Sequence, residues 1–181
     1  PWPPPDQLRD VETLNFVANC RRTGAGDEFM WDAVHRKARD NARTPMPWDD
    51  SPNGGFTTGE PWIMLNPDYP QVNVAAAKRD PNSVFYFYKK LIELRKGNLI
   101  MPYGEPTLLL PEDEQVFAYE KRLDGEHWLI AGNFSDEAVE RPLSCLVPGS
   151  ELILSNVSET LEADGVLRLQ PWEGVIIRLP E

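Results

Sequence analysis

Apolar and polar residues alternate with a period of two through most of the second half of the chain. This period is typical of half-buried β-strands, because successive side chains point to opposite faces of a sheet. Leu123-Asp124-Gly125-Glu126 reads as a tight hairpin turn, since Asp-Gly tolerates positive φ. Short strands with turn signals between them predict an antiparallel β-sandwich. The expected strands cover residues 107–110, 116–122, 127–133, 138–143, 151–155, 166–169 and 174–179.

Helical spacing governs the first half instead. Leu8, Val11, Leu14 and Ala18 predict a helix that Asp6 caps and that ends near Gly24. A second helix is expected from Asp27 to about Arg39. Asp80-Pro81 reads as the N-cap and first residue of a third helix, which stops at Gly97. Its apolar face, with Val84, Tyr88, Leu91 and Ile92, is wider than a surface helix needs.

Between these helices, residues 44–80 have no sustained period, because prolines and glycines interrupt them repeatedly. Irregular segments of this length are uncommon in compact domains and are usually functional or disordered. Trp48, Phe56 and Trp62 argue against disorder, since large aromatic side chains gain stability by packing. We therefore expect this segment to pack against a large body that the chain does not fully contain.

Composition excludes several classes of protein. A formal net charge of -11 opposes a phosphate backbone, so nucleic-acid binding is not expected. The apolar runs are too short for a membrane span, and the opening prolines do not form a signal peptide, so the chain looks cut at Pro1. Two distant cysteines, Cys20 and Cys145, fit a reducing compartment and thus the cytoplasm.

The residues alone offer no complete catalytic constellation. Glycoside hydrolysis needs two carboxyl groups that face each other across a sugar, but the adjacent Asp49 and Asp50 are better explained as turn residues. His35 and His127 have no metal-ligand partner at useful spacing, so no metal is expected. No phosphate-binding or redox motif predicts a cofactor. Among the strand aromatics, Tyr119, Trp128 and Trp172 are expected to face the core.

One long segment carries a specific resemblance. It runs Arg39-Asp40-Asn41-Ala42-Arg43-Thr44-Pro45-Met46-Pro47-Trp48-Asp49-Asp50 and continues to Gly59. Together with Arg9-Asp10-Val11-Glu12-Thr13-Leu14-Asn15 and the segment from Asp80 to Lys96, it resembles the oligo-1,6-glucosidases of the α-amylase superfamily. Trehalose-6-phosphate hydrolases and dextran glucosidases are close relatives in that superfamily. Pro47 stands where these relatives commonly have Gln.

The resemblance implies an architecture. It covers essentially the whole chain and assigns it an α+β fold, with the last helices and an active-site-face loop of a (β/α)8 barrel followed by an antiparallel β-sandwich. Residues 1–102 would be the end of the catalytic barrel, and residues 103–181 the C-terminal sandwich domain. The third helix would close the barrel, which would explain its wide apolar face.

The resemblance also implies an activity for the full-length enzyme. It would release terminal α-linked glucose, preferably α-1,6-linked, from short oligosaccharides with retention of configuration. The family's nucleophile, acid/base and transition-state-stabilising carboxylates match no position here and are expected upstream of Pro1, so the chain alone should be inactive. Arg43 matches the arginine that hydrogen-bonds the terminal glucose, and a guanidinium offers several fixed donors to sugar hydroxyls.

Several alternatives stay open. From the residues alone, a salt bridge that anchors the loop is the favoured role of Arg43, and only the resemblance favours the sugar contact. The substrate could be trehalose-6-phosphate, and dextran glucosidase or sucrose isomerase activity would fit the same motifs. The sandwich could instead be a carbohydrate-binding module, or the chain an inert structural fragment. Without the rest of the barrel, exposed helix faces would favour self-association.

Overall fold

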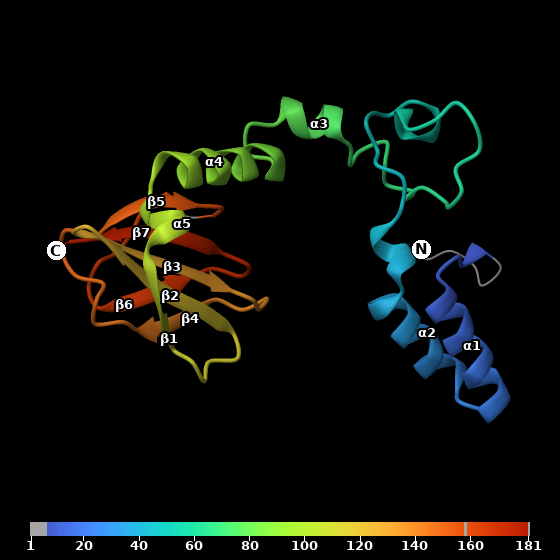
Figure 1. Cartoon of the computed structure of the whole chain (residues 1–181), viewed down its shortest axis with the longest axis horizontal. Coiled ribbons are helices and arrows are strands. Elements are labelled where there is room, and N and C mark those ends of the chain that lie inside the picture. Colours follow the sequence, from blue (N-terminus) through green and yellow to red (C-terminus); the bar gives the residue numbers. More distant parts are fainter. Residues whose placement is uncertain (1–6, 158, 181) are drawn as a thin grey trace. The chain divides into compact units, whose positions relative to one another are not determined.

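The computed structural model describes residues 7–157 and 159–180 and divides the chain into two compact units, Pro1–Tyr86 and Phe87–Glu181 (Figure 1). The first unit contains helices and irregular segments, and the second is dominated by antiparallel sheets. Among the described residues, no helix has the combined length and apolar character needed to cross a bilayer.

Two helices open the first unit, α1 (Val11–Thr23) and α2 (Asp27–Lys37). Gly24 ends α1 in the left-handed conformation, with φ 74°, as the sequence predicts for a glycine stop. The two helices bury a small apolar cluster between them, because each carries a narrow apolar stripe on one face. That cluster consists of Leu8, Val17, Cys20, Met30, Val34 and Ala38.

The start of α1 differs from the prediction. Asp10 is its N-cap, and the Asp10 side chain accepts a hydrogen bond from the Thr13 amide. The predicted cap, Asp6, lies outside the described residues. Leu8 precedes the helix and is buried against the helix pair, so its apolar character reflects packing of the approaching chain. Spacing alone could not separate these two roles.

The segment after α2 is irregular, as predicted, but it contains three short helices. They are the 3-10 helices η2 (Arg39–Ala42) and η3 (Pro52–Gly55) and the α-helix α3 (Val74–Arg79). In η3, Asn53, Gly54 and Gly55 all have positive φ, which lets the Gly54 carbonyl accept a hydrogen bond from the Trp48 amide at 2.7 Å. The loop is therefore folded back on itself and ordered.

Helix α4 (Val84–Gly97) begins later than the sequence predicts. Asp80 forms a turn in which its carboxylate accepts the Asn82 amide and its carbonyl accepts the Ser83 amide, so Pro81 lies in that turn. No described residue of α4 is buried, and Val84, Tyr88 and Ile92 are exposed. The wide apolar face is thus present, but the part with Val84, Tyr88 and Ile92 is uncovered in this chain.

The second unit confirms the predicted antiparallel sandwich. Its larger sheet has the strand order β1-β2-β3-β7-β5, and a second sheet pairs β4 with β6 (Figure 1). Asp124 and Gly125 form the predicted hairpin turn between β2 and β3, both with positive φ. The strands are β1 (Glu105–Leu109), β2 (Val116–Leu123), β3 (Glu126–Asn133), β4 (Val139–Pro142), β5 (Glu151–Ser155), β6 (Val166–Leu169) and β7 (Gly174–Leu179).

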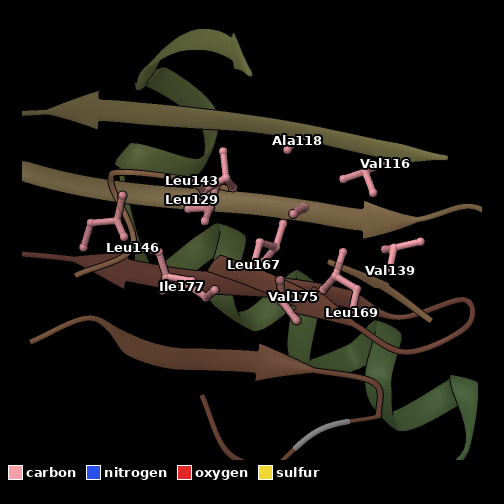
Figure 2. Close-up of a cluster of buried hydrophobic side chains, with 12 residues drawn as sticks. Val116, Ala118, Leu129, Val139, Leu143, Leu146, Leu167, Leu169, Val175 and Ile177 are labelled. Carbon is pink, nitrogen blue, oxygen red and sulfur yellow. The ribbon is translucent and has the colours of Figure 1, made fainter. Parts of the chain in front are cut away.

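The main core lies on one face of the larger sheet. Figure 2 shows its side chains converging from β2, β3 and β7 and from the smaller sheet. Alternate residues of β2, β3, β6 and β7 enter this core, which is why the period of two predicts these strands well. The core consists of Val116, Ala118, Leu129, Ala131, Val139, Leu143, Leu146, Leu167, Leu169, Val175, Ile177 and Leu179.

The opposite face of the larger sheet is partly covered by helices. Trp128 and Ile176 pack there against Ile100 of α5 (Ile100–Tyr103), and Leu91 and Leu94 of α4 contact the same cluster. Directly after α5, Gly104 leaves no room for a side chain, since a Cβ would lie 2.6 Å from the Ile100 carbonyl oxygen. The helices and the sheet are therefore closely joined.

The aromatic residues of the strands follow the prediction only in part. Trp128 is buried, with 1% of its surface exposed, and Tyr119 is half-buried. Trp172 contradicts the prediction: it lies in the turn before β7 with φ 58°, and 60% of it is exposed. The short connection between β6 and β7 requires a left-handed residue there, which the apparent alternation does not reveal.

Candidate functional site

Arg43 immediately follows η2 and caps it. Its amide donates a hydrogen bond to the Asp40 carbonyl oxygen at 3.1 Å, which closes the last turn of η2. The side chain is exposed, and within residues 7–157 and 159–180 its guanidinium forms no ion pair or hydrogen bond. Arg43 therefore presents a full set of donors on a fixed backbone.

Arg39, at the start of η2, has the opposite role. Its Nε and Nη2 atoms donate to Asp10 Oδ1 at 2.9 and 2.7 Å, while Asp10 itself is buried at the start of α1. Two adjacent donors on one carboxylate make a strong, directional contact. The salt bridge that anchors this loop is thus made by Arg39 and not by Arg43.

Asp10 is held as a carboxylate by its hydrogen bonds. The Thr13 hydroxyl donates to its Oδ2 atom at 2.7 Å, and Arg39 adds side-chain and backbone donors. The hydrogen bond from Thr13, followed by those from Arg39, keeps the pKa of Asp10 well below its usual range, although burial opposes this shift. Asp10 therefore stays charged at neutral pH and can bind Arg39 continuously.

Asp40 adds a second link between the same two segments. It is 1% exposed, and its Oδ2 atom accepts hydrogen bonds from the Arg9 amide at 2.8 Å and the Asp10 amide at 3.0 Å. Its other oxygen, Oδ1, is buried without a hydrogen-bond partner in the part of the chain that the structure describes, as is Asn41 Oδ1. Asn41 Nδ2 donates to the His35 carbonyl at 2.7 Å, which ties η2 to α2.

Large apolar side chains surround this region without being buried. Met46, Trp48, Phe56 and Trp62 are all exposed, although aromatic residues of such a segment are expected to pack. An open hollow of about 400 Å³ lies beside Trp62 and is also lined by Arg9, Asn53 and Glu60. In this chain, backbone hydrogen bonds order the loop, and these four side chains lack cover.

The other acidic and histidine candidates have structural roles. Asp49 Oδ1 accepts hydrogen bonds from the Ser51 hydroxyl and amide, which lower the pKa of Asp49, so it caps a turn as the sequence suggests. Buried His127 lies 2.7 Å from Glu120 through its Nε2 atom. Within the described residues, no group of three or more His, Cys, Asp or Glu side chains is placed to hold a metal ion.

Arg43 stays a prediction from the sequence, and the contacts in the segment before it were not predicted. Asp10 and Asp40 are thirty positions apart, and no local pattern predicts that they meet. One signal was available, because each aspartate follows an arginine, at Arg9-Asp10 and Arg39-Asp40. Both dipeptides lie at the start of a helical element, where backbone amides are free to donate.

Comparison with protein families gives two adjacent matches. Residues 11–104 match the alpha amylase catalytic domain, and residues 107–176 match the maltogenic amylase C-terminal domain. The first match covers α1 through α5, including the site around Arg43, and the second covers nearly all of the sandwich.

Several characterised proteins are similar to the chain over almost its whole length. The oligo-1,6-glucosidase of Parageobacillus thermoglucosidasius is 42% identical over 99% of this chain, and the trehalose-6-phosphate hydrolase of Escherichia coli is 38% identical over 92%. These alignments cover 33% and 30% of the respective relatives. The chain therefore spans about a third of the length of the relatives it matches.

Solved structures agree with this result. The trehalose-6-phosphate hydrolase of Bacillus licheniformis superposes with a TM-score of 0.88 and 32% identity, covering 97% of this chain and 32% of that protein. The trehalulose synthase MutB of Pseudomonas mesoacidophila gives a TM-score of 0.86 and 34% identity, covering 99% of this chain and 33% of that protein. The helices, loop and sandwich thus have direct counterparts in both enzymes.

Proposed function

This chain belongs to the α-amylase family of glycoside hydrolases, and we propose that it is part of a retaining α-glucosidase that releases terminal α-linked glucose from short oligosaccharides. The first substrates to consider are α-1,6-linked, because oligo-1,6-glucosidases from three bacteria are 40–42% identical to the chain. The whole activity needs the catalytic body that these relatives contain and this chain does not span.

Arg43 is proposed to bind the substrate. The supporting observation is the contrast with Arg39, because Arg39 forms the anchoring salt bridge and the Arg43 guanidinium stays exposed without one among the described residues. Its planar set of five N–H donors suits the paired hydroxyls of a glucose ring. The nucleophile and the acid/base carboxylate are proposed to lie upstream of residue 1, so the chain alone should not hydrolyse glucosides.

The two halves are proposed to have different parts in that enzyme. Residues 1–102 would complete the catalytic barrel, and residues 103–181 would form the C-terminal sandwich domain. The exposed apolar face of α4, with Val84, Tyr88 and Ile92, supports a partner surface on the rest of the barrel. For the same reason, the isolated chain is proposed to self-associate. The free thiols of Cys20 and Cys145 support a reducing, cytoplasmic location.

A trehalose-6-phosphate hydrolase is the second candidate. Two curated enzymes of that activity are 38% and 39% identical to the chain. An anionic substrate would need cationic groups near the bound sugar, and Arg43 alone is insufficient evidence for such a pocket. A carbohydrate-binding role for the sandwich is the third, and it would require residues 103–181 to bind glycans by themselves.

The test uses a hybrid enzyme in which this chain replaces the matching third of the Parageobacillus oligo-1,6-glucosidase. We expect the hybrid to release nitrophenol from nitrophenyl α-glucoside and the chain alone to release none. Arg43→Ala should lower kcat/KM roughly 10- to 100-fold, because a charge-assisted hydrogen bond to substrate is lost. Arg36→Ala is the matched control, since Arg36 is an exposed arginine that pairs with Asp32 on α2.

Substrate competition separates the candidates. Faster hydrolysis of isomaltose than of trehalose-6-phosphate by the hybrid, with Arg43→Ala impaired on both, supports the proposal. The opposite preference supports the phosphate hydrolase. For that conclusion, the two thirds of the hybrid that come from the Parageobacillus enzyme must first be shown not to set the substrate preference. An active hybrid in which Arg43→Ala matches Arg36→Ala would remove Arg43 from the site.

A further inference from the structure

The hollow beside Trp62 combines features of a site for a small polar ligand. It has a volume of about 400 Å³, and the Trp62 side chain at its wall is 56% exposed. Gln7, Arg9, Asn53 and Glu60 place polar groups around the same space. Small-molecule sites are typically concave, with an apolar surface and a few polar groups that fix the orientation of the ligand. The hollow has this composition, and the proposed function leaves it unused.

The shape of the hollow is fixed largely by Asn53. Its backbone lies in the left-handed region, with φ 56°, and its Nδ2 atom donates hydrogen bonds to the Gly59 carbonyl at 2.9 Å and the Thr57 carbonyl at 3.2 Å. These bonds tie the turn that precedes Trp62 to η3. Directly after Trp62, Ile63 is buried, with 4% of its surface exposed. Trp62 is thus carried by a backbone that is held on both sides, so little ordering is needed when a ligand binds.

Three hydrogen-bonding groups of the hollow remain available to a ligand. Within residues 7–157 and 159–180, the Glu60 carboxylate forms no hydrogen bond or ion pair, and neither Asn53 Oδ1 nor Trp62 Nε1 has a hydrogen-bond partner. A carboxylate and an amide oxygen accept hydrogen bonds, and an indole N–H donates one. Together they complement sugar hydroxyls, because each hydroxyl can both donate and accept.

The charges and the aromatic surface favour a neutral sugar. Among the described residues that line the hollow, Arg9 and Glu60 carry opposite charges, so their sum does not favour an anion such as a phosphate ester. The exposed Trp62 indole is flat and apolar, which suits the C–H face of a pyranose ring. A glucosyl unit has both such a face and a rim of hydroxyls.

We propose that this hollow binds one glucosyl unit of an oligosaccharide, separate from the terminal glucose that Arg43 is proposed to hold. The choice of an α-glucan as ligand rests on the proposed function. The Trp62 ring packs against one face of the pyranose, and Glu60 and Asn53 accept hydrogen bonds from its hydroxyls. The site holds the oligosaccharide and takes no part in bond cleavage.

The first test is an NMR titration of the isotope-labelled chain with isomaltotriose, which the chain alone should not hydrolyse. We expect saturable shifts of the Trp62 indole and Asn53 side-chain amide signals, with a Kd in the millimolar range. The indole signal of Trp172, which is exposed on the sandwich, should not move. Unchanged Trp62 and Asn53 signals would overturn the proposal.

Variants assign the binding to the hollow. Trp62→Ala removes the aromatic surface and should raise Kd roughly tenfold. Glu60→Gln keeps the size of the side chain but removes its charge, so Kd should rise about threefold. Trp172→Ala is the matched control and should bind as the parent does. Parent affinity in Glu60→Gln would contradict the proposed contact, and this variant decides the matter if Trp62→Ala does not fold.

The hybrid enzyme tests the alternative that the rest of the catalytic body covers the hollow. If the hollow is open there, Trp62→Ala should change the melting temperature by less than about 2 °C. A larger drop would mean that Trp62 is buried in the assembled enzyme, which overturns the proposal.

The two proposals can fail separately. The titration uses neither Arg43 nor catalysis, so a hybrid that is inactive or insensitive to Arg43→Ala removes the proposed function and leaves binding at the hollow in place. An active hybrid that depends on Arg43, together with a chain whose hollow binds no isomaltotriose, removes only the second site.

Discussion

The two units of this chain differ in the size of the apolar core that each encloses. In residues 87–181, two sheets face each other and enclose a core of twelve buried side chains. In residues 1–86, α1 and α2 bury six, while Phe29, Met46, Trp48, Phe56 and Trp62 remain exposed. A sheet pair closes a core by itself, whereas the helices and loop have a second apolar surface that needs another partner.

This difference indicates which part of the chain is an independent fold. The sandwich encloses the larger core and should set the global stability of the chain. The first unit has a small core and depends on hydrogen bonds such as those between Asp10 and Arg39 for order. We therefore expect the first unit to open at lower cost than the second.

The largest expected effect is loss of a core side chain from the sandwich. Leu129 is 0% exposed in the main core, so Leu129→Ala should lower the free energy of unfolding by about 3 kcal/mol through lost burial and a residual cavity. Urea denaturation measures this change. Leu108→Ala, at an exposed position on β1, is the control and should change it by less than about 0.5 kcal/mol. Equal effects would mean that the sandwich core does not dominate stability.

A cavity in the first unit should have a smaller and local effect. Met30→Ala removes a buried side chain between α1 and α2 and should cost about 2 kcal/mol, near the low end for such changes, because a small cluster can collapse. Amide hydrogen exchange should accelerate in α1 and α2 alone. Acceleration in β3 and β7 as well would show that the units do not unfold separately.

Acid should weaken the sandwich through Asp113. The Asp113 carboxylate accepts hydrogen bonds from Arg141 and from the Val116 and Gln115 amides, which lower its pKa from 3.8 to about 2. Because the folded-state pKa is depressed, this stabilisation is present above pH 4 and is lost as the pH falls towards 2. It amounts to at most about 2 kcal/mol.

The measurement compares urea denaturation of the parent and Asp113→Asn between pH 2 and 7. The difference between them should be greatest at neutral pH and shrink towards pH 2, since other carboxylates titrate equally in both. A difference that stays constant with pH would assign the effect to packing of the side chain and not to its charge.

Loss of one helix cap in the first unit should have the smallest effect. Asn73 Oδ1 accepts the Ala76 amide at 2.8 Å at the start of α3, and its Nδ2 donates to the Tyr69 carbonyl. Asn73→Ala should lower the free energy of local opening of α3 by about 1 kcal/mol. This change would appear as faster amide exchange at Ala76. Asn73→Asp keeps the capping oxygen and is the control. Unchanged exchange in Asn73→Ala would mean that packing, not the cap, holds α3.

These contrasts also explain what the sequence could predict. All seven strands followed from alternation, because most of them have one face in a core contained in the chain. Helix α3 was missed, since six residues give too short a period and its cap is an asparagine within a proline-rich segment. The start of α4 was misjudged because Asp80-Pro81 forms a turn as readily as a helix start.

The candidate site was less accessible to sequence reasoning than the fold. Arg43 was named as a candidate by resemblance alone, and its role stays a prediction, because an exposed arginine has no local sequence pattern that indicates what it binds. The hydrogen bonds beside it join Asp10 to Arg39 and Asp40 across about thirty positions, so they depend on tertiary structure. The prediction that Trp172 faces the core was wrong for a related reason, because its exposure follows from the backbone conformation of one turn.

Helices α4 and α5 have consequences for how such genes could be shuffled. By family match, they belong with the catalytic domain, which ends at residue 104, yet their apolar residues pack against Trp128 and Ile176 of the sandwich. A recombination point placed at that family boundary would separate Trp128 from its cover and interrupt the chain at Gly104, where no other residue fits. Productive exchange of the C-terminal module would therefore carry α4 with it, so that the inherited unit is longer than the domain.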